Sequence, residues 1–308
     1  MNKRDKLAYL ADLEEGYRPF DKHALSLLRS LLDDGDAEVR AEAIACLWDD
    51  PDPRWIDLLM QKATQDAHAE VRAHAISALG RYVFEGEAAE FEGWASQLFN
   101  LSRQDYTRVV EFLFNIARDA DEATGARRYA IEALAFRSDD PAVGDLIEWA
   151  YSQHDRRLKV SSLFAMARHG GPRWTPYILT ELESADSQIQ YEAVRAAGEL
   201  GLREATDRLI DLAQSRSTKK PLRLLAIYAL AETGDERAYP ILEKLVRSRD
   251  RDIRDVAREA IEEWRTVNEI EQMADDDTDF DPEDIADYFD VDDMPEIWGA
   301  ENAPFSRN

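Results

Sequence analysis

A short pattern that recurs along the chain constrains the fold more than any other feature. It consists of an apolar residue, a basic residue, two variable positions, a small residue, an apolar residue, two variable positions and a final apolar residue. Its clearest copy lies in residues 36–47, DAEVRAEAIACL. The second position of the pattern, here called the basic slot, is filled in order by Arg40, Arg72, Arg127, Lys159, Gln190, Arg223 and Arg254. The spacings of 32, 55, 32, 31, 33 and 31 residues are typical of a solenoid, in which each repeat buries its apolar face against its neighbours.

Signals for the start and the end of helices recur in phase with this pattern. Proline occurs where the first helix of several units is expected to begin, at Pro53, Pro141 and Pro172. Proline lacks a backbone N–H, and in the first turn of a helix that N–H would have no acceptor within the helix. Glycine stands where helices are expected to end in left-handed backbone, at Gly80, Gly170, Gly201 and Gly234. The sequence therefore predicts an all-α protein, a right-handed α-solenoid of about seven helical-hairpin repeats.

Three parts follow from the position of the repeats. Residues 1–21 are expected to hold an N-terminal capping helix, since a terminal repeat needs a polar outer face, and residues 22–267 are expected to form the solenoid. The 55-residue spacing leaves about 23 residues over. They predict an inserted helix at about 84–104, which either packs and widens the solenoid or serves binding. Residues 268–308 differ in composition and are assigned to a C-terminal tail.

The tail is acidic and also rich in large apolar side chains. From Glu269 onward there are 15 acidic residues and one basic residue, out of a net charge of −26 for the whole chain. Acidic clusters interleaved with aromatic residues are typical of a segment that orders on a surface. The tail is therefore expected to bind a partner protein or to dock on its own chain, through Phe280, Ile285, Tyr288, Phe289, Ile297 and Trp298.

The charge also limits the class of partner. A net charge of −26 repels nucleic acid and anionic membranes and favours a basic protein or peptide. The first residues lack the apolar core of an export signal, and no stretch approaches the roughly 18 apolar residues of a membrane span. These features predict a soluble, cytoplasmic protein with no membrane partner.

The repeat units resemble HEAT repeats, specifically the bacterial HEAT-like class first described in phycobilin lyases. The resemblance rests on Asp36, Val39-Arg40, Ala43-Ile44 and Leu47 with their six echoes, and covers about residues 22–265. It implies that the acidic and basic positions form a ladder, here Asp36–Arg40, Asp155–Lys159 and Asp250–Arg254. Gln190 in the basic slot and His68 in the acidic one depart from that scheme.

The resemblance implies little about activity, because such repeats serve in scaffolds, lyases, hydroxylases and DNA glycosylases. The di-iron hydroxylase branch uses His-Glu pairs, and none of the five histidines here precedes a glutamate. One cysteine, Cys46, excludes a disulfide within the chain and a cysteine-based zinc site. No nucleophile motif or phosphate-binding loop is present. No catalytic residue, metal site or cofactor is therefore predicted, and an enzymatic role is left open but disfavoured.

The surface expected to act is the concave one, which the second helices of HEAT units line. Positions two and five after the basic slot should point out of the core on that side. Aromatic residues beside mixed charges along one groove suit a protein ligand; the candidates are Tyr129, Glu132, Phe164, Glu192, Arg195 and Tyr228. The prediction is a protein-interaction scaffold that binds a basic protein or peptide on this face, through the tail, or both. The alternatives are a phycobilin-lyase-like enzyme or chromophore chaperone, and an acidic inhibitor, immunity or nucleic-acid-mimic protein.

Overall fold

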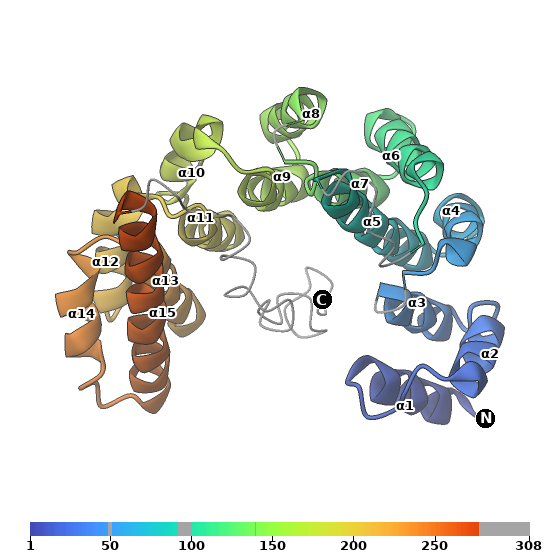
Figure 1. Ribbon diagram of the computed structural model, residues 1–308, viewed down its shortest axis with the longest axis horizontal. Coiled ribbons are helices and arrows are strands. Elements are labelled where there is room, and N and C mark those ends of the chain that lie inside the picture. Colours follow the sequence, from blue (N-terminus) through green and yellow to red (C-terminus); the bar gives the residue numbers. More distant parts are fainter. Residues whose placement is uncertain (49–50, 92–99, 139, 277–308) are drawn as a thin grey trace.

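Two rows of helices form an arch in the computed structural model, which describes residues 1–48, 51–91, 100–138 and 140–276 (Figure 1). Each helix of the inner row packs on the next one along that row. The inner row consists of α1 (Lys3–Glu14), α3 (Ala37–Ala45), α5 (Ala69–Phe91), α7 (Thr124–Leu134), α9 (Arg156–His169), α11 (Ser187–Glu199), α13 (Lys220–Glu232) and α15 (Arg251–Asp276).

The outer row covers the convex side, and each of its helices packs on the inner helix that follows it in the chain. The row consists of α2 (Lys22–Leu31), α4 (Ile56–Gln65), α6 (Arg103–Arg118), α8 (Pro141–Ser152), α10 (Thr175–Glu181), α12 (Thr206–Gln214) and α14 (Ala238–Leu245). Single 3₁₀ turns lie at Cys46–Trp48, Pro53–Trp55, Pro172–Trp174 and Arg203–Ala205. The predicted all-α solenoid is confirmed, and the described residues contain no strand. None of the helices in that part of the chain is long and apolar enough to cross a membrane.

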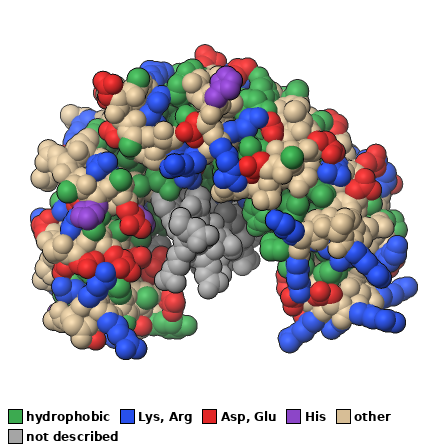
Figure 2. Space-filling view, turned by 180° about the vertical axis from the view of Figure 1, so that it is seen from behind, with side chains coloured by type: hydrophobic (Ala, Val, Ile, Leu, Met, Phe, Trp, Pro, Cys, Tyr) green, Lys and Arg blue, Asp and Glu red, His purple; other side chains and the backbone are tan. Residues whose placement is uncertain are grey.

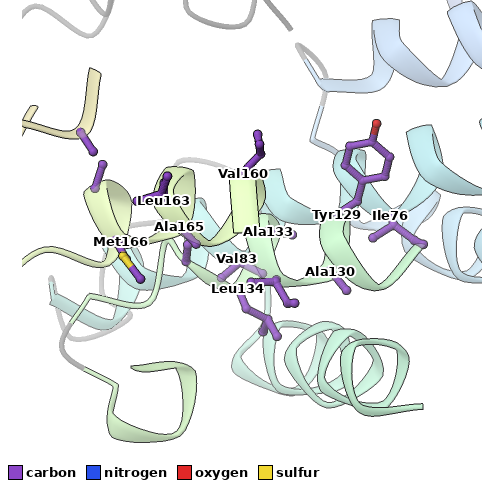
Figure 3. Close-up of a cluster of buried hydrophobic side chains, with 14 of the residues drawn as sticks. Ile76, Val83, Tyr129, Ala130, Ala133, Leu134, Val160, Leu163, Ala165 and Met166 are labelled. Carbon is purple, nitrogen blue, oxygen red and sulfur yellow. The ribbon is translucent and has the colours of Figure 1, made fainter. Parts of the chain in front are cut away.

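The apolar positions of the repeat form one continuous core between the two rows. In the clearest unit Val39, Ala43 and Ile44 are fully buried, and the matching Val71, Ala75 and Ile76 are buried to the same degree. Figure 3 shows the centre of the arch, where Leu134 of α7 and Met166 of α9 lie in the same cluster of buried side chains. Because each repeat contributes the same stripe of apolar residues, burial continues from one unit to the next.

The basic slot caps the outer helix of its own hairpin. Six of the seven side chains donate a hydrogen bond to a main-chain carbonyl near the end of that helix, whereas Lys159 donates to the Glu181 carboxylate of the next hairpin at 2.6 Å. The acceptors are Asp34 O for Arg40, Asp66 O for Arg72, Ala117 O for Arg127, Leu182 O for Gln190, Ala213 O for Arg223 and Ser248 O for Arg254. The last carbonyls of a helix have no partner inside it, and a long polar side chain supplies one. A neutral amide can do this as well as a guanidinium, which explains why Gln190 fits the slot.

The ladder that the family resemblance implied is built from other pairs. Among the described residues Asp36, Asp155 and Asp250 cap the inner helices instead, each accepting hydrogen bonds from two backbone N–H groups one turn ahead. An aspartate at the N-cap accepts hydrogen bonds from backbone N–H groups of the first turn, which have no acceptor within the helix.

Asp36, Asp250 and Asp186, which caps α11 in the same way, also pair with basic residues of the preceding inner helix. The pairs are Lys3 with Asp36 at 2.9 Å, Arg156 with Asp186 at 2.8 Å, and Lys220 with Asp250 at 3.1 Å. A ladder between neighbouring units therefore exists. Some of its basic members lie in the first turn of the inner helices, and two lie in the basic slot, where Arg40 pairs with Asp66 at 2.8 Å and Lys159 with Glu181 at 2.6 Å.

Two boundaries differ from the sequence-based expectation. Residues 84–91, expected to begin an inserted helix, continue α5, and residues 92–99, with Trp94 and Leu98, lie outside the described residues. The last helix, α15, runs on to Asp276, nine residues past the expected end of the solenoid at 267, since residues 268–276 contain neither glycine nor proline. The tail residues named for binding, Phe280, Ile285, Tyr288, Phe289, Ile297 and Trp298, also lie outside the described residues.

Candidate protein-binding surface

The inner helices present three repeat positions to the concave side, at two, five and nine residues after the basic slot. On α9 these are Ser161, Phe164 and Arg168, and Arg157 continues the same stripe one turn earlier, because residues three and four apart share a helix face. Figure 2 shows basic side chains beside the hollow at the middle of the arch. The concave surface has a central part on α7, α9 and α11, and a C-terminal part on α13 and α15.

The two central aromatic residues are buried, contrary to the expectation that they are exposed. Tyr129 is 8 % exposed and Phe164 is 6 % exposed. The guanidinium of Arg128 lies 4.6 Å from the centre of the Tyr129 ring, and that of Arg195 lies 4.6 Å from the centre of the Phe164 ring. A guanidinium that lies over an aromatic face is attracted to it and shields the ring from water.

A polar network joins α7 to α9 beside these rings. Arg128 Nε donates to Ser161 Oγ at 2.9 Å, and its Nη2 lies 3.5 Å from Glu132 Oε1. Glu132, a predicted binding residue, is 4 % exposed. Burial raises the pKa of Glu132 although Arg128 opposes that shift. Glu132 therefore lies beneath the concave surface and presents little area to a ligand.

The two remaining predicted residues of the central part, Glu192 and Arg195, form an ion pair on α11. Arg195 Nε donates to Glu192 Oε2 at 2.9 Å, and Nη1 donates to Glu199. Burial disfavours the charge on Arg195, but the two carboxylates outweigh it and raise the pKa of the guanidinium. Its Nη2 is buried and makes no hydrogen bond in the described part of the chain.

The positive charge of Arg168 on α9 is less well neutralised by carboxylates than that of Arg195. Its nearest carboxylate oxygen, Glu199 Oε2, lies 4.0 Å from Nε, and both Nε and Nη2 are buried without a hydrogen-bond partner among the described residues. Burial lowers the pKa of Arg168, and Glu199 offsets only part of that effect. Arg168 is thus a nearly buried cation with N–H groups that have no acceptor, which is unusual in a folded protein.

The C-terminal part carries the opposite charge. Tyr228 of α13, the last predicted residue, is half-buried and lies near Glu232 of its own helix and Glu259 and Glu263 of α15. Burial, with help from these three carboxylates, raises the pKa of Tyr228 to about 12. Burial likewise raises the pKa of Glu232 to about 8, reinforced by Glu199 and Glu263 and opposed by Arg195.

Gly198 allows α11 and α13 to approach each other at the border of the two parts. A Cβ at this position would lie 2.0 Å from Glu232 Oε2 and 2.9 Å from Ala229 Cα. Only a residue without a side chain leaves room there for the Glu232 carboxyl group. Gly198 therefore determines how Glu232 meets the side chains of α11.

A hollow of about 350 Å³ lies at the edge of the central part. Its lining includes Arg72 of α5, Arg157 of α9 and residues 123–126 at the start of α7. No ion pair of Arg157 is present in the described residues, and no side chain caps the start of α7. In the same part of the chain, no group of three or more His, Cys, Asp or Glu residues could hold a metal ion.

The sequence-based reasoning missed Arg168, Glu199, Glu232 and Glu263, which all lie nine residues after a basic slot. The signal that could have found them is the helical period, since position nine lies one turn beyond position five. Gly198 carried no such signal, because its neighbour Glu232 comes from another repeat. The structure brings Glu192 and Arg195 together, and places Tyr129, Phe164 and Tyr228 on three different helices of the inner row.

Comparisons with known proteins agree with the architecture. The family model for HEAT repeats matches residues 25–91 and 175–262. Yeast importin-β, Kap95p, superposes with a TM-score of 0.52 at 15 % sequence identity, over 86 % of this chain and 39 % of the importin chain. The complex of Kap95 with Nup1 gives 0.51 at 15 % identity, over 88 % and 40 %. The CpcE–CpcF complex of phycocyanin lyase from Nostoc sp. PCC7120 gives 0.46 at 17 % identity, over 79 % and 94 %. Among curated proteins, no sequence matches this chain.

Proposed function

This chain belongs to the HEAT-repeat family, and from that premise we propose that it is a protein-interaction scaffold that binds a basic segment of a partner protein on its concave surface. The observation that carries the proposal is Tyr228, a half-exposed aromatic ring with Glu232, Glu259 and Glu263 around it. One structure that resembles the chain is the complex of Kap95 with a second protein, Nup1.

The surroundings of Tyr228 suit the side chain of a lysine or an arginine. The face of an aromatic ring attracts a cation, and carboxylates at its edge accept charge-assisted hydrogen bonds from the same group. Glu259 is exposed and Glu263 is half-buried, so both can be reached from the concave side. A ring that anchors a partner side chain, bordered by charges, is a common arrangement at the centre of an interface.

A labelled basic peptide tests the proposal. The probe is a fluorescein-labelled dodecapeptide of lysine, arginine and glycine, and its binding to the full chain is followed by fluorescence anisotropy. The double substitution E259Q/E263Q removes two carboxylates beside Tyr228 and is expected to weaken binding about fivefold, the effect of two partly exposed ion pairs.

The matched control is E204Q/E243Q. Glu204, in the 3₁₀ turn before α12, and Glu243, in α14, are exposed, and their replacement changes the net charge by the same amount. Binding to this control is expected to stay within about twofold of the unaltered protein. Equal losses in the two double variants would mean that the probe responds to overall charge, and the proposal would be wrong.

A further inference from the structure

Four arginines lie on the central part of the concave surface and are here called the central arginine cluster: Arg128, Arg157, Arg168 and Arg195. Arg128 is paired with Ser161 and Glu132, whereas the other three have donors available for a ligand. Nε and Nη2 of Arg168 and Nη2 of Arg195 are buried without a hydrogen bond. Arg157 is exposed and forms no ion pair in the described ranges. Buried guanidinium groups normally have all their donors satisfied, so the cluster is suited to an anionic ligand.

Carboxylates are suitable acceptors for this cluster. A carboxylate accepts two parallel hydrogen bonds from one guanidinium, and such charge-assisted bonds are stronger than neutral ones. The hollow beside Arg157, with Arg72 and the start of α7 in its lining, widens the surface on which an acidic chain could lie. The ligand expected here is therefore an acidic peptide.

The chain itself contains such a peptide. Residues 277–308 include eleven acidic residues and one basic residue, Arg307. Aromatic residues are interleaved with the acids, among them Phe280, Tyr288 and Phe289. This segment matches the arginine cluster both in charge and in its supply of rings, which can stack on guanidinium planes.

The segment is also long enough to reach the cluster. It begins directly after Asp276, the last residue of α15, which belongs to the inner row. The three steps from α15 through α13 and α11 to α9 span about 30 Å, at roughly 10 Å between packed helices. Thirty-two residues can extend to about 100 Å.

We propose that residues 277–308 dock on the central arginine cluster of their own chain. Carboxylates of the segment accept the hydrogen bonds that Arg168, Arg195 and Arg157 leave open. The docked segment closes the centre of the surface to other acidic ligands, and the acidic C-terminal part on α13 and α15 remains the place for a basic partner. This inference does not depend on the proposed function.

Hydrogen–deuterium exchange of the full chain tests the docking. Peptides that cover residues 277–308 are followed by mass spectrometry in the unaltered protein, in R157Q/R168Q and in the control R247Q/R249Q. Arg247 and Arg249 are exposed residues of the turn before α15. Exchange in residues 277–308 is expected to become about tenfold faster in R157Q/R168Q, because two charged contacts are lost, and to stay unchanged in the control. High salt should accelerate exchange in the unaltered protein toward the level of R157Q/R168Q.

Other outcomes would overturn the inference. Fast exchange of residues 277–308 in all three proteins would mean that the segment does not dock, and slow exchange in all three would mean that it docks elsewhere. Protection that appears only at high protein concentration would assign the contact to a second copy of the chain. Peptides from the core of α9 are followed in the same experiment, so that unfolding of R157Q/R168Q is recognised and, if it occurs, R157Q alone decides.

Discussion

The centre and the C-terminal part of the concave surface use one repeat position in opposite ways. Phe164 and Tyr228 both lie five residues after a basic slot. Phe164 is 6 % exposed and lies beneath Arg195, with Arg168 close by, whereas Tyr228 is half-buried among three glutamates. The position in the repeat determines where a side chain lies, and the residues of the neighbouring repeats determine whether it is exposed and what it can bind.

Truncating the two rings gives the largest expected difference. Phe164→Ala removes a buried aromatic ring and is expected to lower the free energy of unfolding by about 4 kcal/mol. Tyr228→Ala removes a ring that already meets solvent and is expected to cost about 1 kcal/mol. Urea denaturation followed by circular dichroism measures both. Equal losses would show that the two positions are buried alike in solution and that the contrast is wrong.

The second largest effect is expected from a side chain placed between α11 and α13, where the two parts of the surface meet. Gly198→Ala places a methyl group against Glu232 and Ala229 and is expected to cost about 2 kcal/mol, because the helices must separate. Gly125→Ala is the matched control, since a Cβ there meets nothing within 4 Å. It is expected to be neutral or to stabilise the protein slightly by restricting the unfolded chain. A stable Gly198→Ala variant with an unchanged pKa of Glu232 would contradict the close approach of α11 and α13.

The last expected effect depends on pH and vanishes in acid. The folded-state pKa of Glu232 is about 8, above the ordinary value of 4.5, so the folded protein binds the proton more tightly than the unfolded chain. Stability from this residue is therefore lost as the pH rises from about 4.5 to about 8. Glu232→Gln resembles the protonated form at every pH. It should match the unaltered protein at pH 5 and be more stable by roughly 2 kcal/mol at pH 9, well below the full value of the shift because Glu232 is partly solvated.

Thermal unfolding at several pH values, with Glu243→Gln as the control, measures this difference. Glu243 is exposed on α14, so its replacement should leave the pH dependence unchanged. A pH profile of Glu232→Gln that is parallel to that of the unaltered protein would mean that Glu232 is ionised at neutral pH, like an ordinary surface carboxyl group.

Periodicity was enough to predict the fold and insufficient to predict the surface. The spacing of Val39, Ala43, Ile44 and their echoes places the core because every repeat solves the same packing problem. The contacts of Arg168 and Glu232 could not be predicted, since they depend on which side chains of the next repeat face them. The burial of Tyr129 and Phe164 escaped prediction for the same reason, as it depends on how arginine side chains fold over the rings.

The bonds that hold each hairpin together differ from those that join one hairpin to the next. Most basic-slot side chains bond carbonyls within their own hairpin and are half-buried, as with Arg72 and Gln190. Arg40 and Lys159 also reach the next hairpin, where they pair with Asp66 and Glu181. The ladder pairs Lys3–Asp36 and Lys220–Asp250 cross between hairpins, and their side chains are between 36 % and 48 % exposed. Salt weakens exposed ion pairs far more than buried hydrogen bonds. The arch should accordingly be softer at the joints that exposed pairs bridge than at the joint that the buried Arg40–Asp66 pair bridges, and its span should vary with ionic strength.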